Sequence, residues 1–172
     1  KMRQELLSLD QAKSIITGLD YVRGGPQGME LFNAIGVIAP GLRLAGLYKK
    51  RILVPFGEYV PFRSVLPIEK VASGIADFTP GESGQYVIEL SRSIRAVPLI
   101  CYEAIFTSLP YTYIPQSPEI ILNITNDSWF GDSSGPFQHL AMAQMRAVEY
   151  GMPLLRVASS GISALISPKG EV

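Results

Sequence analysis

Two nearly continuous apolar runs constrain the fold of this chain most strongly. They are "IRAVPLICYE" (94–103) and "PEIILNITN" (118–126). A strand with one face in water alternates apolar and polar residues, whereas a strand buried on both faces lacks that alternation. The segment 136–150 has the composition of a helix, with Pro136 near its start and Gly151 after its end. Doubly buried strands that alternate with helical segments indicate an α/β fold in which helices cover a sheet.

The other segments predict further elements of the same layered fold. Residues 1–12 resemble the end of an amphipathic helix, and 14–22 and 31–40 predict a hairpin around the turn-forming "RGGPQGME". Residues 43–62 combine a short strand with a loop that contains several prolines. Residues 63–83 form a long connection without a clear hydrophobic periodicity. Three more strands are expected, in 86–90, 153–160 and 162–168, and either Ser134 or Gly135 is expected to cap the helix.

Composition and charge exclude several classes of protein. Hydrophobic residues make up 47% of the 172-residue chain and charged residues 17%, so a disordered chain is excluded. Fifteen basic residues balance fifteen acidic ones, which leaves no electrostatic footprint for nucleic acid. One cysteine and one histidine argue against a zinc site and exclude an intrachain disulfide.

The two ends of the chain look cut. The chain begins on Lys1, within a helix-like segment, and stops after Gly170 in the turn of an unfinished hairpin. We therefore interpret residues 1–172 as one partial domain of a larger protein. No run within residues 1–172 approaches the roughly 20 apolar residues that span a bilayer. This statement applies only to this piece of the protein.

Cys101 is the first candidate for chemistry. A buried free cysteine is most often a small core residue, and this one ends an apolar run. It is also followed by polar residues, and ligands collect beyond the ends of strands in α/β sheets. A nucleophilic thiol needs a charged partner. His139 would give a cysteine–histidine pair, but a histidine on a helix is more often structural.

Lys50 and Glu58 are the stronger partners. Taken alone, Lys49, Lys50 and Arg51 form a solvated basic run. The segment "LVPFGEYVPF" directly after that run is too apolar for a solvated surface, so it is expected to pack into a site and to carry Lys50 and Glu58 with it. A lysine beside a thiolate can bind a developing oxyanion, and a nearby carboxylate can orient the lysine or carry a proton.

Three segments together resemble the nitrilase, or carbon–nitrogen hydrolase, superfamily. They are "YKKRILVPFGEYVPF", "ICYE", and the stretch from "NITNDSWFGDSSGPFQH" to "SALISPKGE". Within that superfamily they are most similar to its membrane-bound apolipoprotein N-acyltransferase branch. The resemblance runs from about residue 14 to the end, and it implies a nitrilase-like α-β-β-α sandwich, incomplete at both ends.

The resemblance also implies roles for individual residues. It places the nucleophile on Cys101, the oxyanion-stabilising lysine on Lys50 and an additional acidic residue on Glu58. It places Tyr102 and Glu103 in the substrate-binding site. Trp129 and Phe130 are expected either to line the acyl or head-group site or to pack in the core. No metal and no cofactor are implied.

The implied reaction transfers a fatty acyl chain from a phospholipid to Cys101 and then to the N-terminal diacylglyceryl-cysteine of an apolipoprotein. The resemblance implies a catalytic domain that faces the periplasm from the bacterial inner membrane. Its membrane contacts would be flanking helices. Residues 62–78 have apolar side chains that suggest a lid facing the membrane; a simple cover over the core is the alternative.

One member of the family's Glu-Lys-Cys triad has no counterpart here. The general-base glutamate lies upstream of the lysine in the family, before the first residue of this chain, and neither Glu5 nor Glu30 sits in a matching motif. We therefore expect the isolated piece to be inactive. Two other functions stay open: a soluble carbon–nitrogen hydrolase with the same chemistry, and a non-catalytic module.

Overall fold

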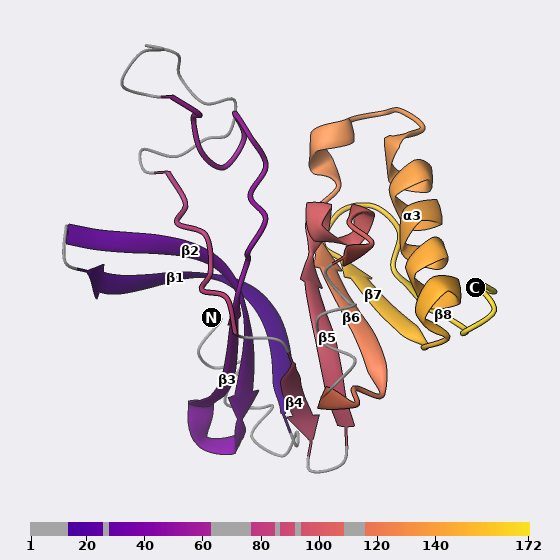
Figure 1. Cartoon of the computed structure of the whole chain (residues 1–172), viewed down its shortest axis with the longest axis horizontal. Coiled ribbons are helices and arrows are strands. Elements are labelled where there is room, and N and C mark those ends of the chain that lie inside the picture. Colours follow the sequence, from indigo (N-terminus) through magenta and orange to yellow (C-terminus); the bar gives the residue numbers. More distant parts are fainter. Residues whose placement is uncertain (1–13, 26–27, 63–76, 85–86, 92–93, 109–115) are drawn as a thin grey trace.

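Two sheets and one long helix form three layers (Figure 1). The computed structural model describes residues 14–25, 28–62, 77–84, 87–91, 94–108 and 116–172. The helix predicted over 1–12 and most of the connection over 63–83 lie outside these ranges. The α/β class is confirmed.

The first sheet has three strands in the order β1-β2-β3. Its strands are β1 (Ile15–Gly25), β2 (Gly28–Ala39) and β3 (Arg43–Lys49), with the short 3-10 turn η1 (Pro40–Leu42) before β3. All pairings are antiparallel. The predicted hairpin is confirmed, but its strands extend into the expected turn, as far as the Gly25–Gly28 pair. Arg23 lies opposite Glu30 in this ladder and forms an ion pair with it at 2.9 Å.

The second sheet has five strands in the order β4-β5-β6-β7-β8. The strands are β4 (Ile88–Ser91), β5 (Ile94–Ile100), β6 (Ile120–Thr125), β7 (Leu154–Ala158) and β8 (Ala164–Ile166). The central strands β5, β6 and β7 run parallel, while β4 and β8 are antiparallel edges. Both apolar runs of the sequence thus form central strands, as predicted.

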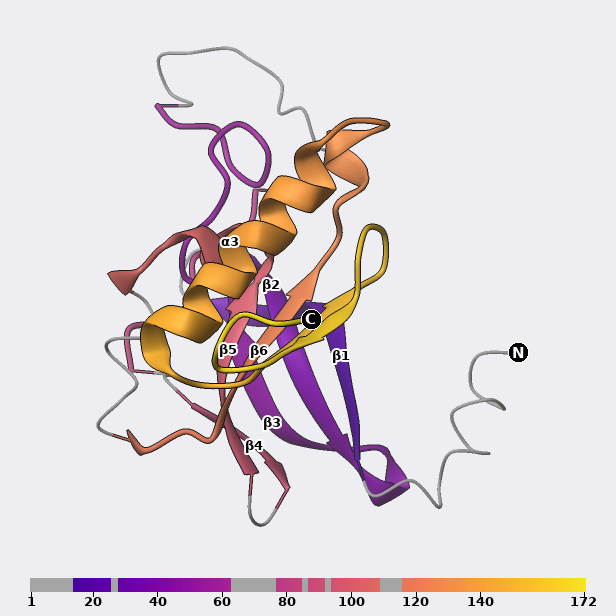
Figure 2. The same cartoon turned by 90° about the vertical axis from the view of Figure 1, so that its right-hand side faces the viewer.

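The helix α3 (Gly135–Tyr150) covers the outer face of the second sheet (Figures 1 and 2). Ser134 occupies the N-cap position without a side-chain hydrogen bond, and Gly151 ends the helix with a left-handed φ of 58°. The short 3-10 helix η2 (Cys101–Ile105) follows β5 directly, and η4 (Ser128–Phe130) follows β6 after two intervening residues.

Two apolar clusters explain why apolar and polar residues do not alternate along the central strands. One lies between the second sheet and α3 and includes Val97, Leu99 and Ile121. The other lies between the two sheets and includes Ala96, Ile100 and Leu122. Successive residues of β5 and β6 therefore enter different clusters, so both faces of these strands are buried. Three layers of the expected α-β-β-α sandwich are present, and among the described residues no helix covers the outer face of the first sheet.

Candidate active site

A cavity of about 930 Å³ lies at the carboxyl ends of β5, β6 and β7. Residues 100–102, 124–126 and 157–159, at or just beyond these strand ends, contribute to its lining, and the facing wall comes from β1 and β2. Parallel strands end at the same edge of a sheet, so the residues that follow them gather at one place. The position expected for a ligand site is thus occupied by a cavity.

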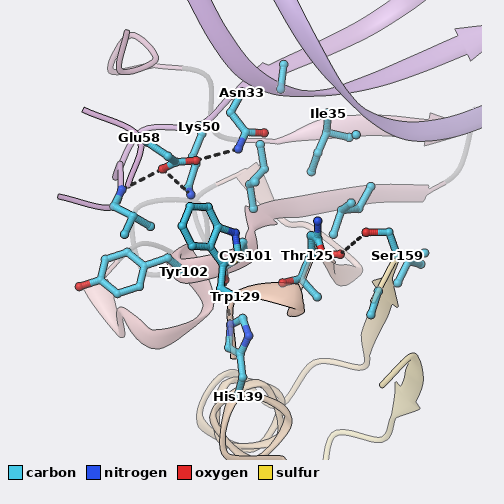
Figure 3. Close-up of a pocket in the computed structure, with 18 of the residues that line it drawn as sticks. Asn33, Ile35, Lys50, Glu58, Cys101, Tyr102, Thr125, Trp129, His139 and Ser159 are labelled. Carbon is cyan, nitrogen blue, oxygen red and sulfur yellow. Dashed lines mark hydrogen bonds and ion pairs between the residues drawn. The ribbon is translucent and has the colours of Figure 1, made fainter. Parts of the chain in front are cut away.

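Cys101 lies in the wall of this cavity, at the first residue of η2 (Figure 3). Its φ of +48° is in the left-handed region, which is uncommon for a residue with a Cβ. This backbone turns the chain sharply from β5 into η2 and brings the half-buried thiol to the cavity. Of the two interpretations offered by the sequence, this geometry favours a thiol accessible to a ligand over a fully buried core residue.

Lys50 and Glu58 line the same cavity and form a buried ion pair. Lys50 is 1% exposed, and its Nζ donates to Glu58 Oε2 at 2.7 Å. Glu58 also accepts hydrogen bonds from the Val54 N–H and from Asn33 Nδ2, both at 2.8 Å (Figure 3). These donors fix the carboxylate, which in turn fixes the ammonium group that faces the cavity.

The loop after β3 holds this pair in place as a folded unit. The N–H groups of Gly57 and Glu58 both donate to the Val54 carbonyl, which closes a tight turn around Phe56. Gly81 donates to the Lys50 carbonyl at 2.7 Å, and a Cβ at Gly81 would lie 2.3 Å from the Lys49 oxygen. Only glycine permits this approach. The prediction that the apolar segment carries Lys50 and Glu58 inward is confirmed.

Glu103 lies behind the cavity and does not line it, which differs from the substrate-binding position expected for it. Its fully buried carboxylate accepts from Tyr48 Oη and from the N–H groups of Arg51, Ile52 and Ile100. One side chain therefore joins the backbone beside Lys50 to the backbone beside Cys101. Burial raises the pKa of Glu103 above its ordinary value, although those N–H donors and the Lys50 charge oppose this shift.

Three predicted aromatic residues line the cavity. Tyr102 packs edge-on against Phe106, with ring centroids 5.0 Å apart. Trp129 and Phe130, on η4, are 55% and 42% exposed. These exposures exclude the core-packing alternative for both residues.

His139 is buried on α3, and both of its ring nitrogens have partners other than the thiol. Nδ1 lies 2.8 Å from Asp127 Oδ1, and Nε2 lies 3.2 Å from the carbonyl oxygen of Cys101. The structural role that the sequence favoured for His139 agrees with this arrangement.

Sequence reasoning missed several polar residues near the site: Asn33, Asn123, Thr125, Asp127 and Arg156. One signal was present, since Arg156 interrupts the apolar strand "PLLRVA" and is only 1% exposed. Within the described residues no group of three or more His, Cys, Asp or Glu side chains is placed to hold a metal ion. No helix in the same part of the chain is long and apolar enough to cross a membrane.

Curated relatives of this chain are apolipoprotein N-acyltransferases. The protein from Rickettsia typhi is 42% identical over 176 residues, covering 100% of this chain and 35% of the relative. The protein from Rhizobium rhizogenes is 41% identical over 169 residues, covering 95% of this chain and 31% of the relative. The chain thus spans about a third of the length of these relatives.

Solved structures support the fold, and a family model identifies the family. A glutamine-dependent NAD+ synthetase from Acinetobacter baumannii matches 99% of this chain and 30% of its own, with a TM-score of 0.68 and 16% identity. A carbon–nitrogen hydrolase from Helicobacter pylori matches 99% of this chain and 61% of its own, with a TM-score of 0.66 and 16% identity. The carbon–nitrogen hydrolase family model matches residues 9–172. The chain belongs to the carbon–nitrogen hydrolase family.

Proposed function

We propose that this chain carries the nucleophile and the oxyanion-binding cation of an apolipoprotein N-acyltransferase. In the first step the glutamate base of the family's triad takes the Cys101 thiol proton, and the thiolate attacks the ester carbonyl of a phospholipid. The S–C bond forms, the ester C–O bond breaks, and the lysophospholipid alcohol leaves with that proton. In the second step the α-amino group of a diacylglyceryl-cysteine attacks the thioester. The C–N bond forms, the C–S bond breaks, and the thiolate is restored.

The observation that carries the proposal is the shared cavity of Cys101 and the Lys50–Glu58 pair. The Lys50 ammonium, held by Glu58, stabilises the negative oxygen that develops in both steps. Glu58 keeps the lysine in position. The proton of the attacking amine passes to the glutamate base, the third member of the family's triad.

Lipid as the acyl donor is supported by the apolar character of the site. Aliphatic and aromatic side chains form much of the cavity wall, among them Ile100, Ile124, Trp129 and Phe130. Phe56 and Phe62 are exposed on the loop after β3, at the end of the molecule that also carries η4 (Figures 1 and 2). The names of the curated relatives support the apolipoprotein acceptor. The proposal places the domain at the periplasmic face of the bacterial inner membrane; the lid suggested for residues 62–78 falls mostly outside the described residues.

The test is to trap the thioester on the full-length gene product. The purified protein is incubated with phospholipid vesicles and digested. The mass of the Cys101 peptide is then measured by mass spectrometry with and without hydroxylamine, which cleaves thioesters. We expect a hydroxylamine-sensitive acyl adduct on Cys101, absent from Cys101→Ala. Release of ammonia from a small amide, with no acyl adduct, would overturn the proposal and select the soluble hydrolase.

A further inference from the structure

A second polar cluster lies behind Cys101, on the opposite side from Lys50. It consists of Asn123, Asp127, His139 and Arg156, each at most 4% exposed. Of these four residues, His139 also lines the cavity, and the other three do not. Asn123 and Arg156 pair across β6 and β7, and His139 projects from the buried side of α3. Charged groups in such a buried layer are costly unless they are paired and hydrogen-bonded. The cluster therefore calls for a physical explanation.

Arg156 organises the cluster from the middle of β7. Its guanidinium donates to Asp127 Oδ2 at 2.7 Å and makes a short hydrogen bond to Asn123 Oδ1. Asp127 Oδ1 accepts from the Thr125 hydroxyl at 3.0 Å and lies 2.8 Å from His139 Nδ1. The backbone also makes room for this carboxylate, because a Cβ at Gly161 would lie 2.4 Å from Asp127 Oδ2. The carboxylate is held from three sides.

The cluster ends at the backbone of the nucleophile. His139 Nε2 lies 3.2 Å from the Cys101 carbonyl oxygen. A carbonyl only accepts, so this contact is a hydrogen bond in the forms of the imidazole that carry a proton on Nε2, which Nε2 then donates. Cys101 itself is held at a φ of +48°, and a residue with a Cβ persists in that region only when its surroundings hold it there. The His139 hydrogen bond is one of the contacts that hold it.

We infer that His139 is a positioning residue for the nucleophile and does not act as its base. Asp127 and Arg156 orient the imidazole, and its Nε2–H fixes the Cys101 carbonyl. The peptide unit is planar, so the direction of the following N–H, that of Tyr102, is fixed as well. The turn then keeps Sγ in the cavity wall with Lys50. This inference rests on the proposed role of Cys101 as the nucleophile.

A cysteine–histidine pair makes the opposite prediction for substitutions of His139. A base requires a basic nitrogen, which neither glutamine nor asparagine supplies. A positioning donor requires only an N–H at the place of Nε2, which glutamine reaches. Asparagine is one methylene shorter, so it reaches the place of Nδ1 beside Asp127 and leaves the Cys101 carbonyl without its donor. His139→Gln and His139→Asn therefore form a matched pair.

The experiment measures both variants in the full-length gene product, with the surface substitution Met145→Ala as the control on the same helix. The readouts are the single-turnover rate of Cys101 acylation from phospholipid vesicles, the KM for the phospholipid, the iodoacetamide reaction rate of Cys101, and the melting temperature. We expect His139→Asn to lower the acylation rate about tenfold at unchanged KM, the effect of one lost hydrogen bond. It should also slow alkylation. His139→Gln should stay within about threefold of wild type in both rates.

Each outcome decides between the alternatives. Equal losses in both variants would overturn positioning and favour a base. Rates equal to wild type in both variants would show that the hydrogen bond has no role. If His139→Asn fails to fold, the rates of the glutamine variant still separate a donor from a base. A wild-type protein that forms no thioester would overturn the proposed function, while the alkylation rates of the two variants would still test the positioning role.

Discussion

Buried charged side chains flank Cys101 on two sides, and the two sides differ in whether those side chains reach the cavity. On the cavity side, Lys50 donates to Glu58 and its ammonium group also faces the cavity. On the far side, Asp127 is enclosed by donors from Arg156 and Thr125. Glu103, which binds the backbone beside Lys50, is likewise enclosed by backbone donors and does not line the cavity. Burial of a charge therefore does not identify a reacting group. Access of the charged group to the cavity identifies it instead. Substitutions on either side of Cys101 can test this comparison.

The largest expected effect is a loss of stability, caused by a substitution on the Asp127 side of Cys101. Arg156→Met leaves the Asp127 carboxylate buried without its cation, so we expect a loss of about 4 kcal/mol in the free energy of unfolding of the full-length gene product. Chemical denaturation measures this loss. The double variant Arg156→Met/Asp127→Leu removes both charges and should recover much of the stability. An unchanged unfolding midpoint in Arg156→Met would show that the buried pair is not a stabilising element.

The second largest expected effect is a loss of activity, caused by a substitution on the cavity side of Cys101. Lys50→Arg keeps a cation that can pair with Glu58, but the planar guanidinium places its charge differently. We expect acylation of Cys101 to fall about a hundredfold, the effect of displacing one oxyanion donor, with little change in melting temperature. Single-turnover acylation and thermal unfolding of the same sample measure the two quantities. Retention of wild-type acylation would contradict the role proposed for Lys50.

The third effect depends on pH and concerns Glu103. Because its pKa is raised in the folded state, the folded protein binds more protons than the unfolded one between the ordinary pKa of 4.5 and the raised value. Within that window the Glu103 contribution to stability falls as pH rises, by at most about 1.4 kcal/mol per pH unit. Glu103→Gln lacks this term, so the advantage of wild type over the variant should shrink as pH rises. Unfolding of both proteins from pH 4 to 7 measures it, and a widening advantage would reverse the sign.

The smallest effect is expected at the exposed rim of the cavity. Trp129→Ser should change the free energy of unfolding by no more than about 0.5 kcal/mol, since the side chain is more than half exposed. Loss of its apolar contact with an acyl chain should raise the KM for phospholipid about fivefold. Phe137→Ser, an exposed aromatic on α3 that does not line the cavity, is the matched control. Equal KM values in both variants would remove Trp129 from the proposed lipid site.

Much of the layered fold could be predicted because it depends on local patterns. The doubly buried runs predicted β5 and β6, and Pro136 with Gly151 predicted the ends of α3. The hairpin was also predicted, although its strands extend further than its glycines and proline suggested. The backbone ladder of the hairpin continues as far as the Gly25–Gly28 pair.

The candidate site was predictable only in part. The apolar segment after Lys50 indicated that Lys50 and Glu58 enter a site. Both residues are buried, although Phe56 and Phe62 of that segment are exposed. The position of Glu103 behind the cavity was not predictable, since consecutive residues of a 3-10 helix point in different directions. Asn33 is 25 positions from the carboxylate it orients, and no local pattern connects the two.

The sequence by itself determined which segments are strands, where the helix begins and ends, and which residues could react, because these depend on neighbours along the chain. Only the tertiary structure decided which polar residues face the cavity and which support Cys101 from behind. Asp127, His139 and Arg156 come from three separate parts of the chain: the loop after β6, α3 and the middle of β7. The pairing of β6 with β7 and the packing of α3 on the sheet bring them together. The cluster depends on contacts between elements, which a one-dimensional pattern does not contain.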